Sequence, residues 1–381
     1  MKRNGNKLNI AFLDFDDLKN PLLSGGQARA TFEVARRLAS LGHKITIITN
    51  RYPGSHDYSY QGIHYKHIGI GTSNLRINNL AFFLALPLTI RSLTADVIVE
   101  CFTAPISTCF SPLFTKIPVI GMPTMFEAKE FSRKYHLPFH LIEKFGCKFY
   151  KYFLAYSASN SKKMRKLNPK ILTRIIPNGI SEEFFKQKEY ERGYALFIGR
   201  IDIVQKGLDL LLSSISKIKK QLDIRIIIAG NGPDDQEIKL KRLIDQYDLG
   251  DKVLFIGRVD GRRKQELLAN CTFGIYPSRF EDFPLVPLEF AAFRKPLICF
   301  DIDGLAWIPK DVSLKAKPFK VQELSANILK LARDNNFRTS LKRKCLNFAR
   351  RYGWNNIALD YQKFFNEIID IEKSKKKVAI T

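Results

Sequence analysis

Four charged residues in the second half of the chain have types and spacing that suit a binding site for a ligand with both phosphate and hydroxyl groups. Arg200 and Lys206 lie in one loop, between a strand predicted at residues 194–198 and the helix that follows it. Glu281 ends a second loop of the same kind, and Glu289 follows eight positions later. Because ligands of open α/β sheets bind at the carboxyl ends of the strands, both loops are expected to line a binding site.

Each of these groups has a role that its chemistry allows. Arg200 can grip a diphosphate with two parallel hydrogen bonds, and Lys206 can act on it as a point charge. The amides of Leu285 and Val286 would point outward from the start of the next helix, which is a natural anion site. The two glutamates can accept hydrogen bonds from sugar or ribose hydroxyls. The alternative for all four charged groups is a solvated surface, and their spacing alone leaves it open.

Short β-type segments alternate with longer helical segments along the chain. The pattern predicts a first series of strands at residues 8–15, 44–49, 64–70, 97–100, 118–121 and 154–157, with a helix at 27–41. It predicts a second series of strands at residues 194–198, 224–229, 252–256, 273–276 and 297–300, with helices at 208–221, 234–248, 263–269, 286–293 and 321–334. Two such series predict an α/β protein with two Rossmann-like domains.

A turn signature, Pro177-Asn178-Gly179, separates the two series. We therefore expect an N-terminal domain at residues 1–177 and a C-terminal domain at residues 178–353. An amphipathic stretch at residues 354–372 is expected to form a closing helix. Residues 373–381 are expected to be a basic tail.

Two common phosphate-binding motifs are missing from the sequence. The first predicted strand is not followed by G-x-G-x-x-G, because the long loop after it holds only Gly25 and Gly26. No G-x-x-x-x-G-K-[ST] segment occurs either. These absences argue against a classical dehydrogenase, a kinase and an ATPase.

The composition favours a globular protein with anionic partners. Lys and Arg number 62 against 37 Asp and Glu, a formal net charge of +25, and 45% of the residues are hydrophobic. The six Cys form no C-x-x-C pair, which argues against a disulfide scaffold and a zinc module. The longest uncharged apolar stretch, residues 80–90, is shorter than the roughly 20 residues that span a bilayer. We expect a protein that is soluble or lies at most on a membrane surface.

Several short motifs occur in a fixed order along the chain. They are Gly25-Gly26 with the helix to Leu41-Gly42-His43-Lys44-Ile45, Ile176-Pro177-Asn178-Gly179, Gly199-Arg200…Lys206-Gly207, Ala229-Gly230-Asn231-Gly232-Pro233, Phe255-Ile256-Gly257 and Glu281…Glu289. Together with Tyr352-Gly353-Trp354, this combination resembles the retaining glycosyltransferases of family 4, which have the GT-B fold. The resemblance covers both expected domains.

The resemblance implies two Rossmann-like domains that face each other across a cleft, with the last helix crossing back to the first domain. It implies that Arg200 and Lys206 contact the diphosphate of a nucleotide-activated sugar. Glu281 is implied to contact the transferred sugar, so that these three residues form the catalytic set, and Glu289 is implied to bind the ribose hydroxyls. The other donor-binding residues that it implies are Gly25 and Gly26 beside the diphosphate, Arg258 and Val259 at the base, and a loop of Phe283, Pro284, Leu285 and Val286 under the phosphates and sugar.

The family's reaction, as the resemblance implies it, retains the anomeric configuration by attack of the acceptor on the face that the phosphate leaves. Arg200, Lys206 and the helix start would then stabilise the charge on the departing nucleoside diphosphate from fixed positions. Members generally work without a bound metal, so no metal site and no cofactor is expected here. The pair Asp301 and Asp303 has the spacing of an Asp-x-Asp motif, but it follows the strand at 297–300 and does not match that motif's position.

The sequence departs from the family pattern in three places. Pro284 stands where many members have Gly, so one backbone donor is missing. Asp303 and Trp307 fall where the family has Gly-Gly and then Glu, and they are expected to reshape the sugar or acceptor side of the site. Thr124 lies nearest to a His with which members contact the donor sugar, so Thr124 is the candidate for a sugar or acceptor contact.

A basic and aromatic segment occupies residues 129–174, with twelve Lys or Arg against two Glu. Phe145, Phe149 and Phe153 recur at every fourth residue, which predicts one helical face that contributes to the core. The lysines beside this face suit an anionic membrane surface, and a solvated face is the alternative. No RNA-binding motif accompanies the segment, so nucleic acid is not an expected partner.

The sequence therefore favours a retaining GT-B glycosyltransferase that moves a sugar from a nucleoside-diphosphate donor to a glycan or lipid-linked acceptor. Its expected place is the cytoplasm, with peripheral contact to the cytosolic face of a membrane. The alternative is a non-catalytic GT-B subunit that binds a sugar nucleotide or glycan beside an active enzyme. The presence of Arg200, Lys206, Glu281 and Glu289 together favours the enzyme.

Overall fold

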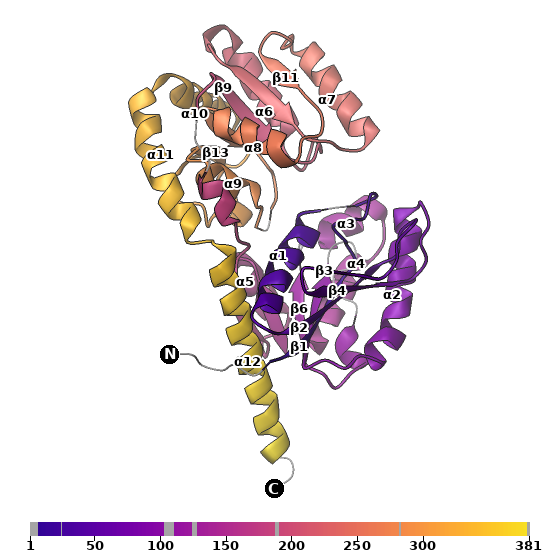
Figure 1. The fold of residues 1–381 in the computed structure, drawn as a ribbon. Helices are drawn as coiled ribbons and strands as arrows, with labels where there is room; N and C mark the ends of the chain where they lie inside the picture. Colours follow the sequence, from indigo (N-terminus) through magenta and orange to yellow (C-terminus); the bar gives the residue numbers. More distant parts are fainter. Residues whose placement is uncertain are drawn as a thin grey trace. The chain divides into compact units, whose positions relative to one another are not determined.

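A computed structural model describes residues 7–23, 25–102, 110–123, 128–186, 190–281 and 283–378 (Figure 1). The described chain divides into two compact units. The first comprises Met1–Asn178 together with Trp354–Thr381, and the second comprises Gly179–Gly353. The division falls at the turn between Asn178 and Gly179, where the sequence pattern restarts.

The first unit is built on a sheet in which parallel pairing dominates. Its strands are β1 (Asn9–Asp14), β2 (Lys44–Asn50), β3 (Tyr58–Tyr60), β4 (Ile63–Ile68), β5 (Val97–Phe102), β6 (Val119–Pro123), β7 (Tyr152–Ala155) and β8 (Leu172–Ile175). In the described residues their order is β3-β4-β2-β1-β5-β6-β7-β8, and β3 pairs antiparallel with β4. The central strand β1 pairs parallel with β2 and β5 and is buried along nearly its whole length, which explains its almost continuous apolar run.

Helices connect the strands of this sheet, as the parallel pairing requires. They are α1 (Gly26–Ser40), α2 (Leu75–Arg91), α3 (Ala128–Tyr135), α4 (Phe139–Gly146) and α5 (Ala158–Leu167), with 3₁₀ turns at Ser111–Leu113 and Cys147–Phe149. α1 begins directly after Gly25 and ends at Leu41, and Gly42 follows with φ 93°, a conformation that favours glycine. The strands predicted at residues 8–15 and 44–49 and the helix predicted between them are therefore present as a β-α-β unit.

The predicted helical face of Phe145, Phe149 and Phe153 is wrong. α4 ends at Gly146, a 3₁₀ turn follows it, and β7 then begins at Tyr152. Phe153 is buried in that strand, whereas Phe145 and Phe149 are exposed. The change from helix to strand breaks the four-residue periodicity, and it leaves two aromatic rings on the surface.

The second unit has a fully parallel sheet in its described residues. Its strands are β9 (Tyr194–Ile198), β10 (Arg225–Ala229), β11 (Val253–Phe255), β12 (Phe273–Tyr276), β13 (Leu297–Phe300) and β14 (Ser313–Ala316), in the order β11-β10-β9-β12-β13-β14. Its helices are α6 (Leu208–Ile218), α7 (Asp234–Gln246), α8 (Gly261–Asn270), α9 (Val286–Ala292), α10 (Val321–Arg333) and α11 (Asn335–Arg350), with 3₁₀ turns at Glu182–Lys186, Lys219–Gln221 and Asp303–Leu305. The sequence pattern missed β14 and α11. β9 and β12 are neighbours, so the loops after them meet at one edge.

The last helix, α12 (Trp354–Val378), belongs to the first unit and packs beside α1. Arg37 of α1 donates a hydrogen bond to the Asn355 side chain at 2.7 Å. Gln362 lies 2.9 Å from a ring nitrogen of His43, which follows α1. The chain thus returns to its first unit after completing the second.

α12 extends further than the sequence indicates. The helix continues to Val378, so the expected basic tail at residues 373–381 begins inside it. Lys375 pairs with Glu372 at 3.0 Å, one turn back along the helix, and such pairs stabilise an exposed helix. None of the helices in the described ranges combines the length and apolar content needed to cross a bilayer.

Candidate active site

The loops after β9 and β12 bring together a lysine, a tyrosine and a glutamate. The Lys206 ammonium donates a hydrogen bond to the Tyr276 hydroxyl at 3.1 Å and a second one to the Glu281 carboxylate. The Tyr276 hydroxyl donates to the same carboxylate oxygen, Oε1, at 2.9 Å. Only 11% of the Lys206 side chain and 8% of the Glu281 side chain are exposed. Two of the three predicted catalytic residues therefore form a buried ion pair.

Tyr276 was not singled out from the sequence, although it ends a strand that was predicted. Burial raises the pKa of its hydroxyl well above the ordinary value, and the charge of Glu281 and the hydrogen bond to it act in the same direction. The hydroxyl therefore stays protonated and remains a donor to Glu281. A strand-end tyrosine next to a candidate loop is the signal that could have identified it.

Two glycines allow the loops of this cluster to touch through their backbones. Gly207 has φ 63°, and a Cβ there would lie 2.0 Å from the carbonyl oxygen of Pro277. A Cβ on Gly304 would lie 1.6 Å from the carbonyl oxygen of Glu281. A side chain at Gly207 would push the Lys206 loop away from the loop after β12, and a side chain at Gly304 would push the Asp303–Leu305 turn away from Glu281.

Arg200 lies in the same loop as Lys206 but in a more open place, with 59% of its side chain exposed. Its guanidinium donates to the side-chain oxygen of Gln205 and lies 3.8 Å from Asp202. The Gln205 carbonyl accepts from the Arg279 amide at 2.9 Å, and Arg279 grips Asp209 with two hydrogen bonds of 2.7 Å. Arg279 therefore ties the loop after β12 to the loop that carries both predicted cations.

Glu289 lies in α9, and its two carboxylate oxygens differ in their contacts with the described residues. Oε1 accepts from the Lys264 ammonium at 2.7 Å. Oε2 is buried without a hydrogen-bond partner among the described residues. Buried polar atoms almost always have partners, so an open acceptor here suits a ligand hydroxyl. The charge of Glu289 also contributes to the raised pKa of Tyr276, which places both glutamates within electrostatic range of that hydroxyl.

The predicted loop beneath the phosphates rests on an aromatic cluster. The Phe283 ring stacks on the Trp307 ring with centroids 4.1 Å apart, and Tyr352 packs beside both. The Trp307 indole donates to the carbonyl of Gly304 at 2.9 Å. Trp307, one of the departures from the family pattern, therefore supports the Phe283 loop.

The remaining predicted residues of the second unit lie at the starts of its helices. Leu285 precedes the first residue of α9, Val286, and both are half-buried, as is Pro284. Arg258 and Val259 follow β11; the Arg258 side chain is exposed and Val259 is half-buried. Their roles at the phosphates and at the base stay predictions.

Two of the predicted donor-binding residues, Gly25 and Gly26, lie in the first unit at the start of α1. The Gly25 amide donates to Asp16 at 2.8 Å, and a Cβ on Gly25 would lie 3.1 Å from the same carboxylate oxygen. Gly26 has open space where a Cβ would stand. Their contact with a donor diphosphate stays a prediction. Thr124 lies outside the described residues.

The carboxyl end of β1 carries an acidic cluster that sequence reasoning did not treat as a site. Asp14 and Asp16 are buried, and Asp14 accepts a hydrogen bond from the Thr31 hydroxyl at 2.5 Å. Burial raises the pKa of Asp14 to about 6. Burial and the charge of Asp14 raise the pKa of Asp16 to about 8. Near neutral pH this pair therefore holds at least one proton beside the Gly25 loop.

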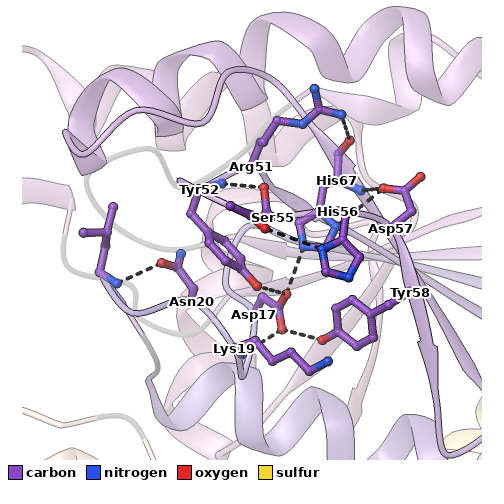
Figure 2. Close-up of polar contacts among 12 residues, drawn as sticks. Asp17, Lys19, Asn20, Arg51, Tyr52, Ser55, His56, Asp57, Tyr58 and His67 are labelled. Carbon is purple, nitrogen blue, oxygen red and sulfur yellow. Dashed lines mark hydrogen bonds and ion pairs between the residues drawn. The ribbon is translucent and has the colours of Figure 1, made fainter.

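Asp17, which follows Asp16, has an environment that lowers the pKa of its carboxyl instead of raising it (Figure 2). Its carboxylate accepts from the hydroxyls of Tyr58 at 2.8 Å and Tyr52 at 3.3 Å, from the Lys19 amide at 3.0 Å, and lies 3.0 Å from Nε2 of His67. Burial acts to raise the pKa of Asp17, but these hydrogen bonds outweigh it and hold the pKa below the ordinary value. Asp17 thus ties the end of β1 to the hairpin of β3 and β4.

Replacing Asp16 with asparagine is expected to stabilise the protein at alkaline pH. A carboxyl whose pKa is raised by folding contributes stability below its unfolded pKa of about 4, and that stability is lost as the pH rises to about 8. Asparagine cannot ionise, and its oxygen can still accept from the Gly25 amide. Above about pH 8 we expect a gain of roughly 1 kcal/mol or more in the free energy of unfolding.

Thermal unfolding of the Asp16→Asn variant and the wild type, measured from acid to alkaline pH, checks this expectation. The two melting temperatures should converge at acid pH and separate as the pH rises. Asp251→Asn, at an exposed carboxylate, is the control. A constant difference across the whole range would contradict a proton held at Asp16.

No group of three or more His, Cys, Asp or Glu side chains in the described ranges is arranged to hold a metal ion. Whether the reaction needs a metal is a separate matter, and metal independence stays a prediction.

Known proteins resemble this chain in both units. The profile of glycosyl transferases group 1 matches residues 180–347, and that of glycosyltransferase family 4 matches residues 24–184. The chain is 26% identical to an uncharacterized glycosyltransferase of Methanocaldococcus jannaschii over 58% of its own length and 64% of that protein, so it spans slightly less than two thirds of this relative. It is 23% identical to the phosphatidylinositol N-acetylglucosaminyltransferase gpi3 subunit of Schizosaccharomyces pombe, over 90% of its own length and 78% of the subunit.

Solved structures share the whole architecture. Sucrose-phosphate synthase from Thermosynechococcus elongatus superposes with a TM-score of 0.79 at 17% identity, over 96% of this chain and 100% of that one. HepE of Anabaena, solved in complex with UDP and glucose, superposes with a TM-score of 0.73 at 16% identity, over 94% of this chain and 99% of that one.

Two parallel α/β units with a final helix that returns to the first of them define the GT-B fold, so that prediction is confirmed. The two profiles together match residues 24–347, across both units. The chain belongs to the family 4 glycosyltransferases.

Proposed function

We propose that this chain is a metal-independent, retaining glycosyltransferase that moves a sugar from a nucleoside-diphosphate donor to a lipid-linked or polysaccharide acceptor. The single observation that carries the proposal is the buried contact of Lys206, Tyr276 and Glu281 at the edge of the second sheet. Membership of the family gives this cluster its chemical context.

Lys206 is proposed to bind the diphosphate while it keeps its partners. An ammonium group has three donors, and two of them already engage Tyr276 and Glu281. The third is left for a phosphate oxygen. Arg200, which is more exposed, can turn from Gln205 to grip the diphosphate bidentately. Together the two cations would stabilise the charge that develops on the leaving group.

Glu281 is proposed to hold the transferred sugar. Lys206 and Tyr276 both bind its Oε1, which fixes the orientation of the carboxylate and leaves Oε2 to accept from a sugar hydroxyl. The open oxygen of Glu289 is proposed to accept from a ribose hydroxyl in the same way. Neither glutamate is assigned as a covalent nucleophile, because retention here is proposed to come from same-face attack by the acceptor.

The names of two similar proteins guide the choice of substrates. HepE was solved with UDP and glucose, which makes UDP-sugars the first donors to test. The relative from Schizosaccharomyces pombe is named as a subunit of a phosphatidylinositol N-acetylglucosaminyltransferase, and this name favours a lipid acceptor. Its naming as a subunit also favours the second candidate function, a GT-B subunit that works within a larger assembly.

Stabilisation by donor nucleotides tests the proposal. Ligand at about 100 times its dissociation constant adds about 2.7 kcal/mol to the free energy of unfolding. We expect one nucleoside diphosphate and its sugar derivative, from a panel that includes UDP and UDP-glucose, to raise the melting temperature by about 5–10 °C. Glu289→Ala should abolish most of that shift, since it removes the proposed ribose acceptor.

Glu266→Ala, at an exposed glutamate of α8, is the matched control and should keep the full shift. Release of nucleoside diphosphate from the stabilising donor, in the presence of a lipid acceptor extract, then separates an enzyme from a binding subunit. A panel that leaves the melting temperature unchanged would refute a donor site in the second unit.

A further inference from the structure

α2 presents an apolar strip to solvent. Ile77, Leu80, Leu84 and Leu88 are between 47% and 72% exposed, and they recur at intervals of three and four residues. This spacing places all four on one side of the helix. Large contiguous apolar patches are rare on monomeric soluble proteins and often mark interaction sites, so the strip is a candidate for one.

The strip lies opposite the face by which α2 packs on its unit. Asn78, Phe82, Leu86 and Ile90 are the buried residues of the helix, and they follow one another at every fourth position. At 100° per residue the centres of the two faces are about 180° apart. A helix that is apolar on both sides is normally enclosed on both sides. In Figure 1, however, α2 lies on the outer flank of the first unit.

Only two charged residues occur in α2, and both are basic. Arg76 and Arg91 lie at its two ends and are exposed. The exposed residues of α2 are therefore the four aliphatic side chains of the strip and one arginine at each end of the strip. No acid occurs in the helix to repel an anionic surface.

A second strip of the same composition lies on α4 and the 3₁₀ turn after it. Leu141, Phe145 and Phe149 are exposed at intervals of four residues. Lys144 and Lys148 are exposed beside them, and the Lys148 ammonium lies 5.4 Å from the centre of the Phe145 ring. The acid of this helix, Glu143, is half-buried.

The segment at residues 110–114 links the two strips. The Arg91 guanidinium lies 5.8 Å from the centre of the Phe114 ring. The Phe110 and Phe149 rings have centroids 5.9 Å apart. Leu113, which lies between Phe110 and Phe114 in the sequence, is exposed. An apolar and basic surface thus extends from the end of α2 to the end of α4 within the first unit.

We propose that the strips of α2 and α4 dock this protein on an anionic lipid membrane. The occupant is inferred from charge and composition: aliphatic and aromatic side chains suit the acyl boundary, and the flanking arginines and lysines suit anionic headgroups. The chain's formal net charge of +25 adds long-range attraction to such a surface. The inference deepens the proposed function, on which it rests, by naming where a lipid-linked acceptor is met. It places the membrane contact on α2 as well as on the basic segment at residues 129–174.

Co-sedimentation of the full chain with lipid vesicles tests the proposal. We expect the wild type to pellet with vesicles of phosphatidylcholine mixed with phosphatidylglycerol, and to pellet much less with phosphatidylcholine alone. The double variant Leu84→Glu/Leu88→Glu should partition about tenfold or more weakly into the mixed vesicles, because two leucines no longer enter the acyl boundary. Lys144→Gln/Lys148→Gln should weaken binding to the anionic vesicles and leave the weak neutral binding unchanged.

The control is Ile238→Glu/Leu254→Glu, which changes two exposed aliphatic side chains of the second unit. It should bind vesicles like the wild type. A wild type that stays in the supernatant with anionic vesicles overturns the proposal, as does equal binding by Leu84→Glu/Leu88→Glu. A wild-type dimer that this variant converts to a monomer, without vesicle binding, would assign the strip to a second copy of the chain instead.

The donor-induced rise in melting temperature, measured on the same variants, separates the two proposals. Loss of vesicle binding with a full donor shift supports both of them. Vesicle binding by a wild type that no donor stabilises would refute the proposed function and leave the membrane surface in place.

Discussion

Replacing Lys206 with alanine is expected to lower the rate of sugar transfer by about 10²–10³-fold, the usual cost of removing one fixed group that stabilises transition-state charge. The ammonium lies at the carboxyl edge of the second sheet, in contact with the Tyr276 hydroxyl and the Glu281 carboxylate. Its removal takes away the proposed phosphate donor. It also removes one of the two hydrogen bonds that hold the Glu281 carboxylate, the proposed sugar contact. Initial rates of nucleoside diphosphate release measure the loss.

The same substitution is expected to destabilise the fold. Lys206 and Glu281 are both largely buried, and removal of one partner of a buried ion pair typically costs about 3–5 kcal/mol. The double variant Lys206→Met/Glu281→Gln removes both charges, so it should recover much of that stability without recovering transfer. Melting temperatures of Lys206→Met, Glu281→Gln and the double variant give the coupling between the residues.

Full transfer activity in the stable double variant would contradict the catalytic assignment. A single variant Lys206→Ala that unfolds at the wild-type temperature would instead contradict the buried ion pair. The two measurements therefore test the chemistry and the packing of this cluster separately.

Replacing Arg200 with alanine is expected to lower kcat/KM by about 10²-fold while leaving the melting temperature unchanged. Its side chain is mostly exposed, and exposed ion pairs such as that with Asp202 contribute about 0–1 kcal/mol to stability. Arg200→Lys should give an intermediate rate, because lysine keeps the charge and loses the bidentate geometry. Steady-state kinetics with the donor found by thermal shift measure both variants.

The control for Arg200 is Arg262→Ala, which removes an exposed arginine of α8 that pairs with Glu266. It should have wild-type kinetics. Wild-type kcat/KM in Arg200→Ala would remove this residue from the diphosphate site, and loss of rate in both arginine variants would point to long-range charge rather than a specific contact.

The two cations proposed to bind the diphosphate differ in how their side chains are held. Lys206 is held by two partners and is largely buried, so its position would be set before the proposed donor binds. Arg200 is held by one neighbouring glutamine and remains accessible. One buried charge beside one exposed charge would suit the proposed site, which must admit a diphosphate and then release it.

Much of this architecture was predictable from the sequence, because it depends on local pattern. The strands at residues 194–198, 273–276 and 297–300 are short apolar runs with turn signals on both sides, and the structure has them with the same bounds. The order of strands and helices is enough to predict parallel sheets, since consecutive parallel strands need a crossover. The types of the four charged residues at the loops were equally visible.

The sequence could not predict which side chains pair with one another or which of them are buried, because both depend on residues far apart in the chain. Lys206 and Glu281 meet only because β9 and β12 are neighbours, and Glu289 pairs with a lysine of a different helix. The fourfold repeat of phenylalanines ends where α4 gives way to β7, which no periodicity reveals.

By itself, then, the sequence determined the fold class, the order of its elements and the types of residue at the loops, because these depend on hydrophobic periodicity and turn chemistry. Only the tertiary structure decided which charge is buried and which is open, which oxygen of Glu289 lacks a partner among the described residues, and that burial raises the pKa of Asp16. It also decided that the leucines of α2 face solvent. Each of these properties depends on the distance to groups that the fold brings together from remote parts of the chain.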